Sequence, residues 1–253
     1  MEDFVNKNSI VRMIWGKSDT ILFIFAGASG EFALNKAVDW LYFTGKLPAD
    51  PLGRLFSTVE YARRIVFSPL HEANSAIDAL QKIHGNVENN RGFSIPDWAY
   101  RDVLFMLIHY SISSYELLER QLSEMEKEEV YNVFCRVGLR MGLKELPSNY
   151  KNWLPVRQSH LAENLQRSMY TDDLFKQYKK HLGIIRYQIL TESQKLVVPN
   201  HVSRLLHFRN ISWLKPMIPL YQIMKTMKAD WLVKKLLLPS QYEKEISELD
   251  MHR

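Results

Sequence analysis

The feature that most constrains the fold is a continuous apolar run from Val103 to Ile108 inside a long helical pattern. The pair Pro96-Asp97 is a typical helix start, and we expect the helix to continue to about Leu122. The run leaves no polar stripe at the helical period, and a helix that is apolar on every side is buried all round. The sequence therefore predicts a central, fully buried helix.

The rest of the chain follows the same helical period. Helix starts occur at Asp50-Pro51 and Ser68-Pro69, and Ser123 precedes an acidic first turn. No segment alternates with period two, and no repeat has a fixed spacing. We expect further helices at about 2–14, 18–44, 52–67, 69–84, 124–141, 154–168, 171–183, 185–194, 202–212, 218–238 and 240–251, with 86–95 as a polar loop.

These patterns predict an all-α fold, a single multi-helix bundle with one domain over residues 1–253. Its motif-bearing core spans about 18–168, and its helical C-terminal part about 169–253. A small C-terminal subdomain is the alternative, because Pro-flanked breaks occur near 147 and 199.

Composition excludes several classes of protein. The single cysteine, Cys135, excludes an internal disulfide and CxxC metal clusters, and we expect it to be a small apolar side chain in a helix. The N-terminal residues do not resemble a signal peptide, and the apolar runs are shorter than the ~20 residues that cross a bilayer. A cytoplasmic location fits best. The net charge of +5 comes without a nucleic-acid motif, so we expect no nucleic-acid partner.

Familiar catalytic motifs are absent. The eight histidines form no HExxH motif and no pair of Glu-x-x-His motifs, which disfavours zinc hydrolysis and di-iron chemistry. The segment 27–30 (GASG) meets neither the GxSxG pattern nor that of a phosphate-binding loop, and is expected instead to allow close helix packing.

Two histidines stand out by their context. His84 ends the amphipathic pattern that carries Ile77 and Leu80, with Gly85 as the expected C-cap, and His109 follows the apolar run. A buried imidazole needs a hydrogen-bond partner or a metal, because an unpaired buried polar group costs ~1–3 kcal/mol. By position alone, a core histidine bonded to a carbonyl is favoured, and an axial haem ligand is the alternative.

Arg54 and Thr58 are a second candidate pair. They lie four residues apart on one predicted helix and so share a face. An arginine with a hydroxyl beside it can hold a carboxylate, a haem propionate or a polar oxygen intermediate. The alternative is a solvated arginine and a threonine without a role.

Part of the chain resembles a known family. Residues 50–58 (DPLGRLFST) are similar to the signature of the MpaB-type oxygenases and the latex-clearing proteins, which are rubber oxygenases. The order of later features also fits: Val66-Phe67, His84 before Val87, a second histidine at His109, and the turn 146–148 (LPS). The resemblance covers roughly residues 18–168.

The resemblance implies an all-α protein that binds haem b. The family's axial iron ligand corresponds to His84, and its arginine and threonine correspond to Arg54 and Thr58 on the distal or propionate side. The family's second histidine corresponds to His109, close to the haem pocket and hydrogen-bonded around it. This chain departs from the family in having Leu107 instead of a tryptophan, Ser29-Gly30 instead of His-Pro, and Ser57 instead of the rubber oxygenases' lysine.

The C-terminal segment 213–238 combines apolar residues with five lysines and one acid, Asp230. A basic amphipathic helix of this kind can lie on an anionic membrane surface, and the alternative is a helix packed on the protein with its lysines in water.

The sequence thus predicts a haem-dependent oxygenase that uses dioxygen on an unsaturated apolar substrate, isoprenoid or lipid-like, with possible peripheral membrane contact. The alternatives are a non-catalytic haem carrier or sensor, and a cofactor-free helical protein that binds lipid or a partner.

Overall fold

The computed structural model describes residues 2–45, 49–209 and 211–226, without the side chains at 41, 51, 52, 54–56 and 226. Every regular element in these ranges is a helix, which confirms the predicted all-α fold. The helices are α1 (Ile10–Trp15), α2 (Ser18–Phe32), α3 (Asp39–Phe43), α5 (Pro51–Phe67), α6 (Leu70–Arg91), α7 (Asp97–Leu118), α8 (Glu124–Arg140), α9 (Tyr150–Asn164), α10 (Met169–Val197), α11 (Asn200–Leu205) and α12 (Met217–Thr226).

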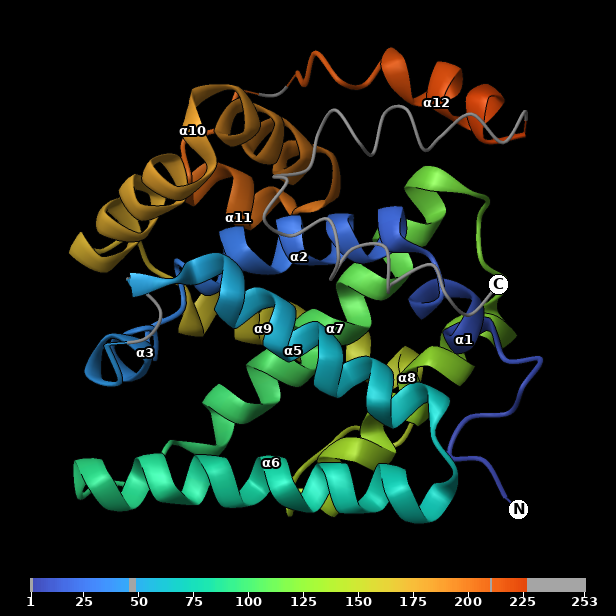
Figure 1. Ribbon diagram of the computed structural model, residues 1–253, viewed down its shortest axis with the longest axis vertical. Coiled ribbons are helices and arrows are strands. Elements are labelled where there is room, and N and C mark those ends of the chain that lie inside the picture. The colour runs from blue at the N-terminus through green and yellow to red at the C-terminus, as the bar shows by residue number, and fades with distance from the viewer. Residues whose placement is uncertain (1, 46–48, 210, 227–253) are drawn as a thin grey trace.

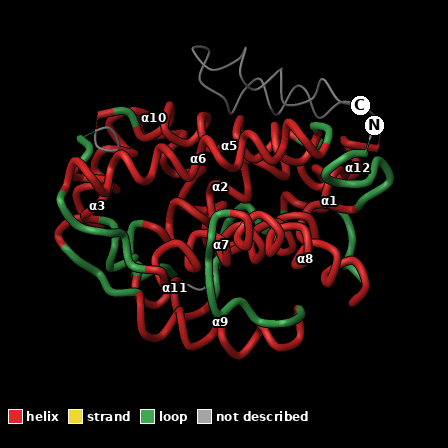
Figure 2. The backbone as a smooth tube through the Cα atoms, turned by 90° about the horizontal axis from the view of Figure 1, so that it is seen from below, coloured by secondary structure: helices red, strands yellow, loops and turns green. Residues whose placement is uncertain are grey.

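Helix α7 is the central element, and α2 packs along it more extensively than any other helix (Figure 1). Gly27 of α2 allows this approach, because a Cβ atom there would lie 2.3 Å from the ring of Tyr110 on α7. The close packing expected of segment 27–30 is therefore confirmed. Helices α8 and α10 also contact α7, while α5 and α6 form an adjacent antiparallel pair (Figure 2).

Two local signals act as the sequence predicts. The Asp50 carboxylate accepts a hydrogen bond from the Gly53 backbone N–H at 2.8 Å, with Pro51 at the first helical position of α5. Ser123 and Glu126 form a reciprocal capping box at the start of α8. Cys135 is buried in α8, as expected.

The prediction that α6 ends at Gly85 is wrong. The helix continues for two further turns to Arg91, and Gly92 is the left-handed C-cap, with φ of 77°. The added turns place the carboxylate of Glu88 within hydrogen-bonding distance of the Ile95 backbone N–H and the Tyr100 hydroxyl. These tertiary bonds offset the ~1 kcal/mol that a glycine costs inside a helix. His84 therefore lies within a helix rather than at its end, and its side chain is half-buried.

The expected helix over 18–44 is also wrong. Helix α2 ends at Phe32, and α3 starts again at Asp39. The Asn35 side chain accounts for the break, because its Oδ1 accepts the Ala37 backbone N–H while its Nδ2 donates to buried Asp102. A local polar bond and a tertiary one thus replace the helical hydrogen bonds.

Further helix boundaries differ from expectation. α1 is confined to 10–15, and α9 starts at Tyr150 because Asn149 accepts the Asn152 backbone N–H. By contrast, the two helices expected at 171–183 and 185–194 are confirmed as the two halves of α10, which a kink separates at Gly183, whose φ is 72°. α11 ends at Leu205, and α7 ends at Leu118. The expected helix at 240–251 lies outside the described residues.

Helix α7 is not buried on every side. Phe105 and Ile108 are completely buried, but Val103 is 40% exposed and Leu107 is half-buried. Both of these line a large cavity, so this apolar face of α7 borders a hollow as well as packed neighbours. Within the described ranges, no helix is long and apolar enough to cross a membrane.

Candidate functional site: a large apolar cavity

The cavity has a volume of about 1160 Å³. That is slightly above the ~300–1,000 Å³ of typical small-molecule sites. Its walls come from helices that are distant in sequence, including α2, α5, α6, α7, α10 and α12. Most of the lining side chains are apolar, so the cavity suits a large and predominantly apolar molecule.

The signature helix α5 forms one wall of the cavity. Thr58, Tyr61, Ala62 and Ile65 line it, and their spacings of three and four place them on one helical face. Ser57 lines it as well. The backbone of Arg54 lies one turn before Thr58 in α5, and the Arg54 side chain lies outside the described residues. The prediction that Arg54 and Thr58 lie one turn apart on one helix is therefore confirmed, and Thr58 lies at the cavity.

His84 lies in the neighbouring wall, on α6. Leu80, Ile83 and Val87 surround it along the same helix and line the cavity with it. Its imidazole ring meets the Tyr100 ring edge-on, with 5.2 Å between ring centroids. Tyr100 is in turn fixed by its hydroxyl, which donates to Glu88 at 3.1 Å. The half-buried imidazole of His84 is thus oriented by an aromatic neighbour within a mostly apolar wall.

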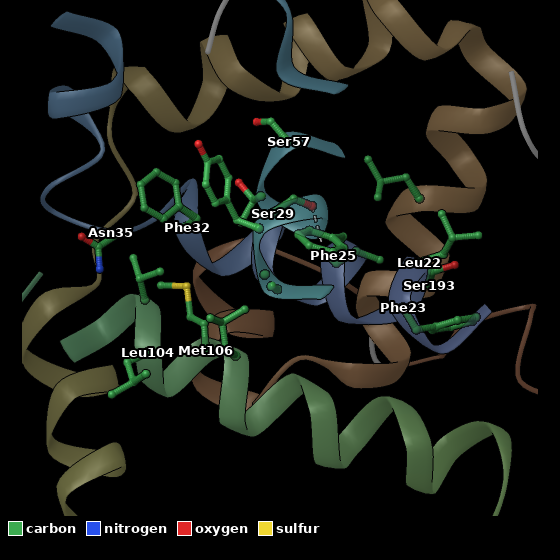
Figure 3. Close-up of a pocket in the computed structure, with 18 of the residues that line it drawn as sticks. Leu22, Phe23, Phe25, Ser29, Phe32, Asn35, Ser57, Leu104, Met106 and Ser193 are labelled. Atoms are coloured by element: carbon green, nitrogen blue, oxygen red, sulfur yellow. Dashed lines mark hydrogen bonds between the residues drawn. The ribbon is translucent and has the colours of Figure 1, made fainter. Parts of the chain in front are cut away.

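Ser29 of α2 adds a polar group to the cavity. Figure 3 shows Ser29 between Phe25 and Phe32 of the same helix, with Met106 of α7 and Ser193 of α10 also at the cavity. The Ser29 hydroxyl donates to the Ala26 carbonyl at 2.9 Å and accepts from the Gln194 amide at 3.1 Å. These bonds fix the hydroxyl in place.

His109 is not among the residues that line the cavity. It lies next to a buried polar cluster of Glu31, Tyr110 and Arg157, and it hydrogen-bonds the backbone of Val197. Burial and the nearby Arg157 charge lower its pKa to about 4, and the Glu31 charge opposes this effect. A neutral imidazole at physiological pH follows.

The cluster beside His109 joins α2, α7 and α9. The Glu31 carboxylate accepts from the Arg157 guanidinium at 2.5 Å and from the Tyr110 hydroxyl at 2.7 Å. Burial alone would lower the pKa of Arg157, but the Glu31 charge and hydrogen bond raise it. The same Glu31 charge, together with burial, raises the pKa of Tyr110.

A second polar cluster lies nearer the N-terminal end of α7. The buried Asp102 carboxylate contacts His160 Nδ1 at 2.5 Å and accepts from the amides of Asn35 and Asn164. Asn35 also lines the cavity. Neither cluster is predicted by the sequence patterns. The one available signal was a charged residue, Glu31 or Asp102, inside an apolar helical pattern, and it does not identify a partner.

Formal charge is scarce at the cavity. Of the lining residues that the structure describes, Asp19 and Arg186 carry the full charges. Asp19 accepts from the Tyr221 hydroxyl at 3.0 Å and from Lys225 at 2.5 Å, and Lys225 also pairs with Glu119. These bonds fasten α12 over one side of the cavity. In the described part of the chain, no three His, Cys, Asp or Glu side chains gather into a metal site.

Comparison with known proteins shows the family. The sequence matches the family described as "ER-bound oxygenase mpaB/B'/Rubber oxygenase, catalytic domain" over residues 17–241. The chain belongs to this family. No curated protein and no solved structure matches it.

Membership of the MpaB/rubber oxygenase family confirms the resemblance carried by residues 50–58 and extends it. The match reaches residue 241, whereas the sequence motifs end near 168. Helices α10 and α12 therefore belong to the family region, and both contribute walls to the cavity. The family indicates an oxygenase-like function with a small-molecule substrate and dioxygen.

Proposed function

We propose that the protein is a haem-dependent oxygenase that acts on an unsaturated apolar molecule, isoprenoid or lipid-like, inside the cavity. The observation that carries the proposal is the position of His84 in the wall of a large apolar cavity that the signature helix α5 also lines. The family description supports the oxygenase class.

The residues at the cavity fit a haem b group. Porphyrin needs a broad apolar space, one imidazole as axial ligand and polar groups for its carboxylates. Here the imidazole of His84 is the proposed ligand, because it lies among aliphatic side chains and is oriented by Tyr100. A single imidazole would suffice, because the four nitrogens of a porphyrin would hold the iron as well.

Each proposed site residue has a distinct task. Haem, when bound, supplies the activation of dioxygen. Thr58 presents a hydroxyl at the cavity, and Arg54 is the proposed cationic partner for a propionate or polar oxygen. The apolar side chains of α2 and α7 exclude water and hold the substrate. His109 is proposed to act from outside the cavity, by fixing α7 where it forms the cavity wall.

Absorption spectroscopy after expression with a haem precursor tests the proposal. The wild-type protein is expected to show a Soret band, and His84→Gly is expected to lose it and to regain it with added imidazole. His71→Gly on the exposed face of the same helix is the matched control and is expected to keep the band. A wild-type protein that takes up no haem would remove the proposal and favour a cofactor-free lipid-binding protein.

Oxygen uptake separates an oxygenase from a haem carrier or sensor. The ferrous protein is expected to consume dioxygen when an apolar alkene is present, and Thr58→Val is expected to slow this without removing the Soret band. Haem binding without alkene-dependent uptake would leave the carrier as the function.

The proposal includes the peripheral membrane contact that the sequence predicts for residues 213–238. Residues 213–226 are described, and 227–238 lie outside the described residues. An apolar substrate dissolves in a bilayer more readily than in water, so contact with a membrane would bring the protein to its substrate.

A further inference from the structure

Positive charge is concentrated in one part of the chain. Residues 174–226 contain nine lysines and arginines but one acidic residue, Glu192. This stretch therefore carries more than the whole net charge of +5. It includes the C-terminal part of α10, which was not expected from sequence to contact a membrane.

Several of these basic side chains face solvent. Lys179, Lys180, Arg209 and Lys215 are exposed. Two other lysines are paired with acids instead. Lys195 pairs with Glu192, and Lys225 pairs with Asp19 and Glu119. The exposed basic residues can therefore meet an anionic surface.

Apolar side chains are exposed in the same part of the chain. Of the sixteen large exposed hydrophobic residues in the described ranges, seven lie between 184 and 223. Ile184 and Ile185 directly follow the break at Gly183 and are 64% and 74% exposed. Ile211 is 79% exposed, and Met217, Leu220 and Ile223 form a ridge along α12. We call these residues, with Trp213, the apolar rim.

Part of the apolar rim lies where the cavity reaches the surface. Trp213, Met217 and Leu220 are each about half exposed, at 51%, 49% and 56%, and they also line the cavity. Arg186, Ile189 and Leu190 of α10 also line the cavity. Figure 1 shows α10 and α12 on the same, upper, side of the molecule.

We propose that this surface docks on an anionic lipid bilayer, with the opening between α10 and α12 facing the lipid, so that the apolar substrate enters the cavity directly from the membrane. The docking part stands on its own observations, and the substrate part rests on the proposed oxygenase function. Exposed isoleucines and a tryptophan insert at the boundary of headgroups and acyl chains, and the flanking lysines meet anionic headgroups.

A bilayer fits this surface better than a protein partner does. Lysine is depleted in protein–protein interfaces, whereas lysines beside exposed apolar and aromatic side chains are typical of interfacial membrane contacts. The surface is also held firmly. The Ser212 hydroxyl donates to the Glu192 backbone carbonyl, and the Trp213 backbone N–H donates to the Glu192 carboxylate. Asp19 and Glu119 hold Lys225 of α12. The apolar rim is therefore presented outward.

Co-sedimentation with vesicles tests the proposal. The full chain is expected to bind vesicles of an equal mixture of phosphatidylcholine and phosphatidylserine, and to bind pure phosphatidylcholine weakly. Lys179→Gln with Lys180→Gln is expected to weaken binding to the mixed vesicles roughly fivefold per lysine. Ile184→Ser with Ile185→Ser is expected to weaken it at least severalfold on both vesicle types. Met125→Ser with Leu139→Ser, an exposed pair on α8, is the matched control and is expected to bind like wild type.

Three outcomes would overturn the proposal: a wild-type chain that stays in the supernatant with both vesicle types, variants of α10 that bind as well as the control pair, or a concentration-dependent dimer that the isoleucine variants abolish. Circular dichroism of each variant shows that the fold is kept. The result is separable from the proposed function, because vesicle binding does not need haem and the Soret band does not need vesicles.

Discussion

Glu31 and Arg157 form an ion pair in which both charged side chains are almost completely buried, with 2.5 Å between the carboxylate and guanidinium atoms. The pair joins α2 to α9, and the Tyr110 hydroxyl of α7 donates to the same carboxylate. Helix α2 thus lines the cavity with some of its residues and supplies Glu31 to this buried pair.

Removing one partner of the buried pair is expected to destabilise the protein strongly. Arg157→Met leaves the Glu31 charge buried without its counter-ion, a loss of typically ~3–5 kcal/mol. Tyr110→Phe removes one hydrogen bond and is expected to cost less, about 1–2 kcal/mol. Urea unfolding measures both. The double variant Glu31→Leu with Arg157→Met is expected to recover part of the lost stability. A loss under about 1 kcal/mol in Arg157→Met alone would contradict this expectation.

Gly27 is expected to tolerate no larger side chain. In Gly27→Ala the added methyl would lie 2.3 Å from the Tyr110 ring. Either α2 or the ring must move, at a cost of about 1–3 kcal/mol. Gly85→Ala is the matched control, because open space surrounds that position within α6. It is expected to stabilise the protein by up to about 1 kcal/mol. Equal thermal unfolding of the two variants would show that the α2–α7 contact is not tight.

His109 is expected to make stability depend on pH. Its folded-state pKa is about 4, below the ordinary value of about 6.5, so the unfolded chain takes up a proton at higher pH than the folded chain does. The contribution of neutral His109 to the free energy of unfolding is therefore complete above about pH 6.5 and is lost as the pH falls toward 4. The whole loss is at most about 3 kcal/mol.

His109→Gln tests this dependence. Urea unfolding at pH 7 and pH 5 is expected to show a smaller loss of stability on acidification in the variant than in wild type. An identical loss in both would assign the acid sensitivity to other groups.

Lys225 is expected to hold α12 over the cavity. Lys225→Met removes the ion pairs to Asp19 and Glu119, and Asp19 then keeps the Tyr221 hydroxyl as its described partner from α12. Amide hydrogen exchange in α12 is expected to speed up severalfold, because local opening becomes easier. Lys215→Met, an exposed lysine just before α12, is expected to leave exchange unchanged. Unchanged exchange in Lys225→Met would mean that apolar contacts alone hold α12.

The sequence by itself determined the helical class and the main caps. Apolar spacing at the helical period, Asp50-Pro51 and the pair Ser123 and Glu126 are local signals, and hydrogen bonds within a few residues realise them. Family motifs pointed to His84 and Thr58, both of which lie at the cavity. The roles proposed for these residues stay predictions.

Tertiary structure decided where helices end and where polar groups meet. Glu88 extends α6 past Gly85 by bonding a residue of the next helix, and Asn35 stops α2 by bonding Asp102. The Glu31–Arg157 pair joins residues 126 positions apart in the chain. A periodic pattern specifies which face of a helix is apolar, but it does not identify what that face packs against. Packing alone decides whether an apolar face, such as that of Val103, meets another helix or a cavity.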